Sequence, residues 1–184
     1  MTLETERLLL RMPDPQDADG YLAIFRDPKV LAFLGISAAS PEDAVDGIQH
    51  MRRHWERHGI GLFSVVRKED ERLLGRVGFL LWDPEPWVNA MRQDLEGELE
   101  TEIGWTLASE HWGQRYATEA AAACRDWALG KLGLTRLVSV IAPGNAASIR
   151  VAEKIGESLE REDLPGPYFG RRVDLYSLGN GPAR

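Results

Sequence analysis

Residues 102–120 constrain the fold of this chain most, because they join an alternating apolar segment directly to a helical one. Ile103, Trp105 and Leu107 alternate with other residues, as in a half-buried β-strand. After Gly113, apolar and small residues recur at helical spacing: Tyr116, Ala120, Cys124, Trp127, Ala128 and Leu132. A strand, a short turn and a helix are therefore predicted in that order.

The start of this predicted helix is a candidate anion site. A helix N-terminus carries unpaired backbone N–H groups and a partial positive charge. Small side chains at Gly113, Ala117 and Thr118 would let an anion come close to those groups. A phosphorylated ligand is consistent with this pattern, but many strand–turn–helix units bind nothing.

The rest of the chain alternates between strand-like and helix-like segments. Asp14 or Asp17 is expected to cap a helix that runs through Phe25. Further helices are expected near residues 28–34, 40–58 and 145–155, and strands near residues 6–11, 62–66, 73–82, 136–141, 158–162 and 172–178. This order predicts an α/β fold (α+β mixed sheet) with helices on both faces of one sheet.

Composition limits the class of protein. With 184 residues and no linker-like segment, residues 1–184 are expected to form a single domain. The net charge of −7 argues against a surface that binds nucleic acid directly, and favours cationic partners such as amines or basic proteins. The single cysteine excludes an intramolecular disulfide framework and a cysteine-based metal cluster.

The sequence also predicts the cellular location of the protein. It has no long apolar run, so no membrane span is expected, and its first residues lack a secretory signal. A cytoplasmic location is therefore the default expectation. The oligomeric state is left open, with a homodimer as one possibility.

Two segments resemble a known family. The run from Trp112 to Ala120 resembles the acyl-CoA pyrophosphate loop of the GNAT superfamily of N-acetyltransferases, closest to its RimJ/RimL-like branch of ribosomal-protein N-terminal acetyltransferases. That loop usually reads Gln/Arg-x-x-Gly-x-Gly/Ala, and Arg115 stands where a glycine is usual. An arginine is tolerated there if its φ is helical, whereas a positive φ would be strained. The second segment, residues 143–156, resembles the Asn-x-x-Ser block of the family, and the resemblance covers nearly the whole chain.

The resemblance implies the GNAT fold, whose strands splay after the pyrophosphate-loop strand to admit the pantetheine arm. It also implies acetyl-CoA as co-substrate, with no metal. The residues that it assigns to cofactor binding are Trp105, Thr106, Leu107, Trp112, Gly113, Gln114, Arg115, Tyr116, Ala117, Thr118, Asn145, Ser148 and Arg150.

Acyl transfer to an amine needs a group that takes the amine proton and a proton for the leaving thiolate. Glu102 lies at the start of the central strand among other acidic residues, and the charge pattern alone favours a solvated strand end. The resemblance implies Glu102 as the candidate base. Asn145 is expected to cap a helix, and the resemblance implies that Ser148 donates a proton towards the departing sulfur.

The other chemically versatile side chains have simpler interpretations. Cys124 lies on the apolar stripe of its helix, so a buried thiol is expected and direct transfer in a ternary complex is favoured over an acyl-enzyme. His54 and its neighbours four residues away on each side are expected on a solvated helix face rather than at a metal. Trp82 and Trp87 adjoin the irregular stretch of residues 83–97 and are candidate walls of the acceptor site.

The sequence thus predicts an acetyl-CoA-dependent N-acetyltransferase that acts on a primary amine, with a protein or peptide N-terminal α-amine preferred. One alternative is a small amine, polyamine or aminoglycoside as the acceptor. An alternative of another class is a non-catalytic regulator that binds acyl-CoA.

Overall fold

The computed structural model describes residues 1–83, 88–89, 95, 97–165 and 172–179. Its strands are β1 (Thr2–Glu4), β2 (Leu8–Arg11), β3 (Leu62–Arg67), β4 (Leu73–Asp83), β5 (Val88–Asn89), β6 (Glu100–Leu107), β7 (Arg136–Ile141), β8 (Ser158–Pro165) and β9 (Arg172–Gly179). They form one sheet in the order β1-β2-β3-β4-β6-β7-β9-β8, with β5 paired to β4 off this path. The β6–β7 pair is parallel and the others are antiparallel, which confirms the mixed sheet.

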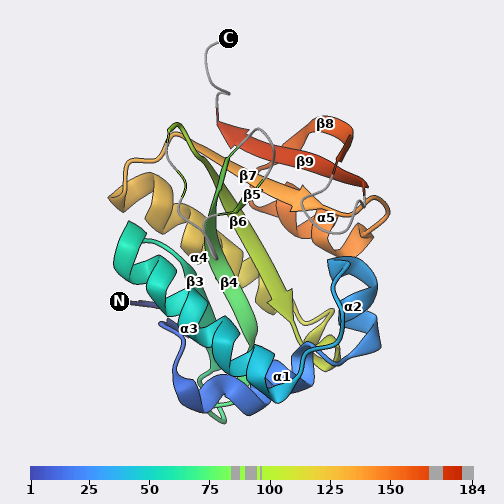
Figure 1. Ribbon diagram of the computed structural model, residues 1–184. Coiled ribbons are helices and arrows are strands. Elements are labelled where there is room, and N and C mark those ends of the chain that lie inside the picture. Colours follow the sequence, from blue (N-terminus) through green and yellow to red (C-terminus); the bar gives the residue numbers. More distant parts are fainter. Residues whose placement is uncertain (84–87, 90–94, 96, 166–171, 180–184) are drawn as a thin grey trace.

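The helices cover both faces of this sheet (Figure 1). They are α1 (Ala18–Ile24), α2 (Pro28–Leu34), α3 (Pro41–His58), α4 (Tyr116–Lys131) and α5 (Ala146–Lys154), with short 3-10 helices at Pro15–Asp17 and Ser109–His111. α1 packs against α3 and β4, whereas α4 packs against β4 and β6. The predicted arrangement of helices on both faces is therefore confirmed.

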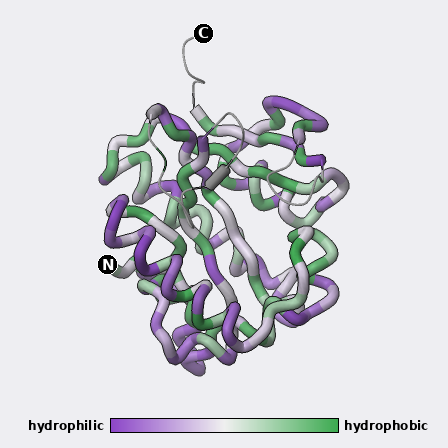
Figure 2. The backbone as a smooth tube through the Cα atoms, in the orientation of Figure 1, coloured by the Kyte–Doolittle hydropathy of each residue, from purple (hydrophilic) through white to green (hydrophobic). Residues whose placement is uncertain are grey.

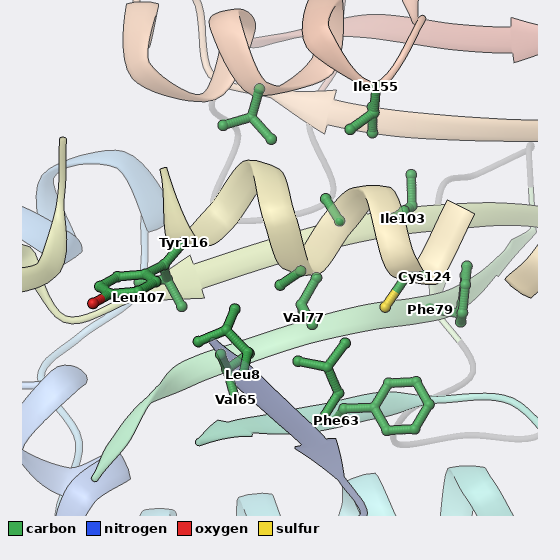
Figure 3. Packing of buried hydrophobic residues seen from close by; sticks show 14 of the residues in the cluster. Leu8, Phe63, Val65, Val77, Phe79, Ile103, Leu107, Tyr116, Cys124 and Ile155 are labelled. Atoms are coloured by element: carbon green, nitrogen blue, oxygen red, sulfur yellow. The ribbon is translucent and has the colours of Figure 1, made fainter. Parts of the chain in front are cut away.

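The main core lies between α4 and the central strands (Figure 3). Cys124 projects from α4 towards this core and is fully buried, as the apolar stripe predicts. Burial raises the pKa of its thiol well above the ordinary value, which argues against a reactive thiolate. Leu132 was expected on the same stripe but is 39% exposed, because it lies at the C-cap, beyond the last turn of α4.

Helical periodicity predicts the buried apolar residues of α3 correctly but fails for one of its histidines. Its apolar positions Ala44, Ile48, Met51 and Trp55 are all buried, while most of the helix is hydrophilic (Figure 2). His54 is buried too, so the expectation of a solvated histidine face is wrong there. Its Nδ1 lies 2.9 Å from the carbonyl oxygen of Ile60, and burial lowers its pKa.

The first strand begins later than the sequence suggests. The predicted strand at residues 6–11 starts at Leu8, because Thr5 makes a turn in which its N–H donates to the Leu8 carbonyl at 2.9 Å. The three residues of β1 precede this turn, and Leu3 pairs with Leu10. A strand of three residues is too short to show a periodic pattern.

Strand pairing around β6 creates the opening that the site uses. Every residue of β6 has a register partner on β4. Within the described chain, β7 pairs with β6 at a single position, Glu102 with Val138. The two parallel strands therefore part after Glu102, as the resemblance implies.

Candidate active site

Two adjoining pockets lie where β6 and β7 part. We call the first, which contains Arg76, Trp82 and Glu102, the inner pocket; its volume is about 170 Å³. We call the second, which contains Gly113 and Arg115, the loop pocket; its volume is about 290 Å³. The residues that line both are Phe33, Leu34, Trp105, Thr106, Asn145 and Ser148. Because they share a wall of six residues, the pockets form one bipartite site.

The loop pocket collects most of the residues expected to bind a cofactor. Trp105, Thr106, Leu107, Trp112, Gly113, Arg115, Tyr116, Ala117, Thr118, Asn145, Ser148 and Arg150 all line it. Gln114 does not; its Nε2 instead donates to the Glu110 carbonyl at 3.2 Å. The α4 N-terminus thus opens into a pocket that also contains the cationic side chain of Lys154.

Arg115 stands where the loop of the GNAT superfamily usually has glycine, and its backbone conformation is strained. Its φ is +67° and its ψ is 7°, so the residue before α4 is in the left-handed region rather than the helical one. A residue with a Cβ atom pays roughly 1–2 kcal/mol in that region. The alternative of an ordinary helical φ at Arg115 is therefore wrong, and the usual glycine at this position has a clear conformational reason.

Two residues near the N-terminus, Thr5 and Arg7, contact the loop before α4 and the first turn of α4. Arg7 donates from Nη2 to the Gln114 carbonyl at 3.2 Å, and its guanidinium lies 4.3 Å from the centre of the Tyr116 ring. Arg7 also donates from Nε to Glu119 at 2.7 Å, and Thr5 donates to the same carboxylate at 2.5 Å. Although burial opposes it, this bonding lowers the pKa of Glu119. No sequence pattern predicts this contact between the first residues and α4.

Glu102 occupies the point at which the strands separate. It is 9% exposed, and Trp82 donates from Nε1 to its Oε2 at 2.5 Å. Burial raises the pKa of Glu102 to about 7, although the hydrogen bonds from Trp82 and from the Val140 backbone act in the opposite direction. Glu102 is therefore a buried carboxylate able to exchange a proton near neutral pH, not the solvated strand end that charge pattern alone favours.

The carboxylate of Glu100, two residues before Glu102, forms an ion pair outside the two pockets. Its carboxylate lies 3.1 Å from Nε of Arg136, which also pairs with Glu160 at 2.8 Å. Glu100 is not among the residues that line either pocket. The structure thus gives different surroundings to two glutamates that lie only two residues apart in the sequence.

A second buried carboxylate, Glu157, was missed by sequence reasoning. It is 4% exposed and directly precedes β8, three residues after the end of α5 at Lys154. Burial, together with the charge of Glu102, raises its pKa to about 8, while a hydrogen bond from Ser139 acts in the opposite direction. Ser139 itself donates to the Ile103 carbonyl at 2.7 Å and lines the inner pocket. Only the pairing of distant strands brings this glutamate near Glu102.

The start of α5 contributes to both pockets. Asn145 caps the helix, since its Oδ1 accepts from the Ser148 backbone N–H at 3.2 Å. The predicted cap is confirmed, and both Asn145 and Ser148 belong to the shared wall. Opposite them lies Phe33 of α2, whose ring centre is 6.5 Å from that of Trp112.

Two tryptophans, Trp82 and Trp87, were predicted to form walls of the acceptor site. Trp82 lines the inner pocket but is only 1% exposed, so it acts mainly as the hydrogen-bond donor to Glu102. Trp87 lies outside the described residues.

Over the described ranges, no three His, Cys, Asp or Glu side chains gather as metal ligands would. Over the same ranges, no helix combines the length and the apolar character needed to cross a membrane.

Comparisons with known proteins agree with this geometry. The family model described as Acetyltransferase (GNAT) domain matches residues 7–157. The chain is 31% identical over 179 residues to the uncharacterized N-acetyltransferase p20 of Bacillus licheniformis, covering 95% of this chain and 93% of that protein. It is similar to the acetyltransferase structure from Agrobacterium tumefaciens, with 31% identity, a TM-score of 0.75 and coverage of 98% and 95% of the two chains.

The fold is also shared with RimL, the ribosomal L7/L12 α-N-protein acetyltransferase, solved in complex with coenzyme A. That structure matches with a TM-score of 0.77 and 16% identity, over 97% of this chain and 98% of the other. At this identity the likeness concerns the fold alone.

Proposed function

The chain belongs to the GNAT acetyltransferase family, and we propose that it moves the acetyl group of acetyl-CoA to a primary amine, preferably the α-amine of a peptide or protein N-terminus. The observation that carries the proposal is the position of Glu102. This buried carboxylate, with a pKa of about 7, lies in the inner pocket, next to the wall shared with the loop pocket.

The loop pocket supplies the groups that would hold acetyl-CoA. Backbone N–H groups from Gly113 to Thr118, at the positive end of α4, suit a pyrophosphate. Arg115 and Arg150 line the same pocket and can bind phosphate oxygens by charge-assisted hydrogen bonds.

The parted strand edge suits the pantetheine arm. The Ile103 carbonyl faces β7, where it accepts from Ser139. Because backbone groups alternate along a strand, those of Trp105 face the same side, and β7 has no register partner for Trp105 among the described residues. We infer that this edge bonds the pantetheine amides, and that a backbone N–H at Trp105–Leu107 polarises the thioester carbonyl.

The proposed reaction is direct. The amine nitrogen attacks the thioester carbon, the C–N bond forms, and the C–S bond breaks to release the thiolate of CoA. Glu102 accepts the amine proton, directly or through water, and Ser148 donates a proton towards the sulfur. With Cys124 buried in the core, the chain offers no thiol there for an acyl-enzyme.

The pKa of Glu102 favours an α-amine over a lysine side chain. An α-amine has an ordinary pKa of about 7.7–8.0 and a lysine amine about 10.4. A proton passes from an α-ammonium to a group with a pKa of about 7 at a cost of about 1 kcal/mol. The same transfer from a lysine costs about 4–5 kcal/mol.

An acceptor screen tests the proposal. Purified protein with acetyl-CoA is offered peptides that begin with Ala, Ser or Met, the same peptides with a blocked N-terminus and an internal lysine, and small amines. Release of free thiol with the open N-terminal peptides is expected, with far less from the blocked ones. Tight binding of acetyl-CoA without thiol release from any amine would contradict the proposal and favour a non-catalytic regulator.

A further inference from the structure

The floor of the inner pocket has a charged side chain at each end. On β4, Arg76 pairs in register with Thr106 of β6, and Leu80 pairs with Glu102. Side chains two residues apart in a strand share one face, so Arg76 and Glu102 lie on the same face of the sheet. Both line the inner pocket.

Between these ends β4 and β6 carry glycines, of which Gly104 lines the pocket and Gly78 is covered by the backbone of Gly61. The register pair that separates Arg76 from Leu80 is Gly78 with Gly104. A Cβ atom on Gly104 would lie 3.4 Å from Oε1 of Glu102, and among the described residues beyond its chain neighbours only the carbon of that carboxylate would also be within 4 Å. The space above Gly104, beside the carboxylate, is therefore open to a ligand.

Arg76 is held at its end of the pocket. Its guanidinium carbon lies 4.7 Å from the centre of the Phe25 ring, and the residue is half-buried. Burial is the main influence on the pKa of Glu102, but the charge of Arg76 acts against it, so the two side chains are close enough to interact. A guanidinium has five N–H donors, so it can bind a carboxylate in addition to its other contacts.

The third charged residue described in the lining, Arg172, begins β9 and is exposed. Its Nε lies 2.6 Å from Asp163, and both side chains are exposed at the rim. The interior cation of the described lining is therefore Arg76, although the molecule as a whole carries a net charge of −7.

Building on the proposed function, we propose that the acceptor is a primary amine that carries a carboxylate near the amine nitrogen, and that Arg76 binds this carboxylate while the amine lies over Gly104 beside Glu102. Thr106 and Glu102 are four residues apart, so their Cα atoms are about 13 Å apart along β6. The arginine and glutamate side chains shorten the gap that a ligand must span. An N-terminal Asp or Glu residue, or a free acidic amino acid, has the required chemistry.

The same arrangement disfavours polycationic acceptors. A polyamine or an aminoglycoside that placed one amine beside Glu102 would bring further ammonium groups towards Arg76, where like charges repel. The acidic surface would attract such molecules, but the interior of the pocket would not. The proposal therefore selects between the acceptor classes that the sequence left open.

The test uses matched acceptors and matched variants. Peptides that differ only as Glu or Gln in the first position, free glutamate, free glutamine and a polyamine are compared by kcat/KM and by binding to the CoA-saturated protein. We expect at least a tenfold preference for the Glu peptide in the wild type, and its loss in Arg76→Gln. In the control, Arg172→Gln, the preference is expected to survive. Comparing the peptides with the free amino acids identifies the source of the carboxylate.

The outcomes separate this inference from the proposed function. Equal binding of the Glu and Gln peptides, or a preference that persists in Arg76→Gln, would overturn the role of Arg76. Preferential binding of the Glu peptide without acetylation would support the inference and contradict the proposed function. Unchanged CoA affinity in Arg76→Gln would show that the variant is folded. The ratio between matched peptides cancels any change in the pKa of Glu102, because that change affects both peptides equally.

Discussion

The loop pocket and the inner pocket adjoin, yet they are built in different ways. The loop pocket is formed mainly by two continuous segments, residues 112–118 and 145–154, and its main groups are the backbone N–H groups of a helix start. The inner pocket combines single side chains from separate strands, such as Arg76, Glu102 and Ser139. In the proposed function, the first half serves as a generic anion site, whereas the second depends on a particular arrangement of charged side chains.

This difference suggests how the two halves can vary. A backbone site tolerates side-chain changes as long as the helix start keeps its geometry. A site made of buried charged side chains depends on each of them, because a charge without its partner is costly to bury. Substitutions in the inner pocket should therefore change turnover and acceptor choice, whereas those in the loop pocket should change the affinity for CoA.

The largest effect is expected in the inner pocket. Glu102→Gln removes the proton acceptor but keeps the shape of the side chain, so turnover of an α-amine peptide should fall roughly 10²–10⁴-fold at neutral pH. Ser148→Ala should lower it less, because water can replace a weak proton donor. Steady-state rates with saturating acetyl-CoA measure both. A tighter or weaker CoA complex in Glu102→Gln would show that the two halves are not separable.

Arg115 tests the loop pocket. Arg115→Ala should weaken CoA binding by about 1–3 kcal/mol if the guanidinium contacts a phosphate. Arg115→Gly should lose less affinity and also gain about 1 kcal/mol of folding stability, because glycine adopts the observed φ of +67° without strain. Calorimetric titration and thermal unfolding measure the two effects. If both variants bind CoA as the wild type does, Arg115 makes no phosphate contact.

The next prediction concerns Arg7, which lines neither pocket but contacts the loop before α4. Arg7→Gln removes the side-chain contacts to Gln114, Tyr116 and Glu119 and keeps the bond from the Arg7 backbone to Glu119. It should raise the KM for acetyl-CoA up to about tenfold while leaving kcat nearly unchanged. Lys68→Gln is the matched control, since Nζ of Lys68 contacts the same N-terminal segment, at Glu4 (3.0 Å) and the Thr5 carbonyl (2.7 Å), but not the loop. A fall in kcat with no change in KM would contradict a role confined to the loop pocket.

Glu157 should show the smallest effect, on stability. Its pKa in the folded protein is about 8, above the ordinary value of 4.5, so the folded state binds the proton more tightly than the unfolded state. The contribution of Glu157 to stability is therefore complete below pH 4.5 and is lost as the pH rises towards 8. Glu157→Gln does not ionise, so its melting temperature relative to the wild type should increase by a few degrees from pH 5 to pH 8. A difference independent of pH would mean that Glu157 titrates normally.

The sequence allowed much of the fold and of the loop pocket to be predicted, because the signals there are local. Helix periodicity identified the buried face of α3, and the cap at Asn145 follows from residue type and position. The inner pocket gave no comparable signal. Glu157, Ser139 and Arg76 approach Glu102 only through the pairing of strands that are distant in the sequence, so no short pattern marks them.

The central claim is that Glu102 takes the proton of the acceptor amine, and the pH dependence of kcat tests it most directly. With acetyl-CoA and an α-amine peptide both saturating, the wild-type rate should rise with pH through an apparent pKa of about 7, as Glu102 becomes ionised. In Glu102→Gln this rise should vanish. The only remaining rise in kcat should follow the pKa of the amine itself, about 7.7–8.0. The difference in kcat between the variant and the wild type should therefore narrow at high pH. A Glu102→Gln variant that keeps the rise near pH 7 and near-normal turnover would contradict the claim.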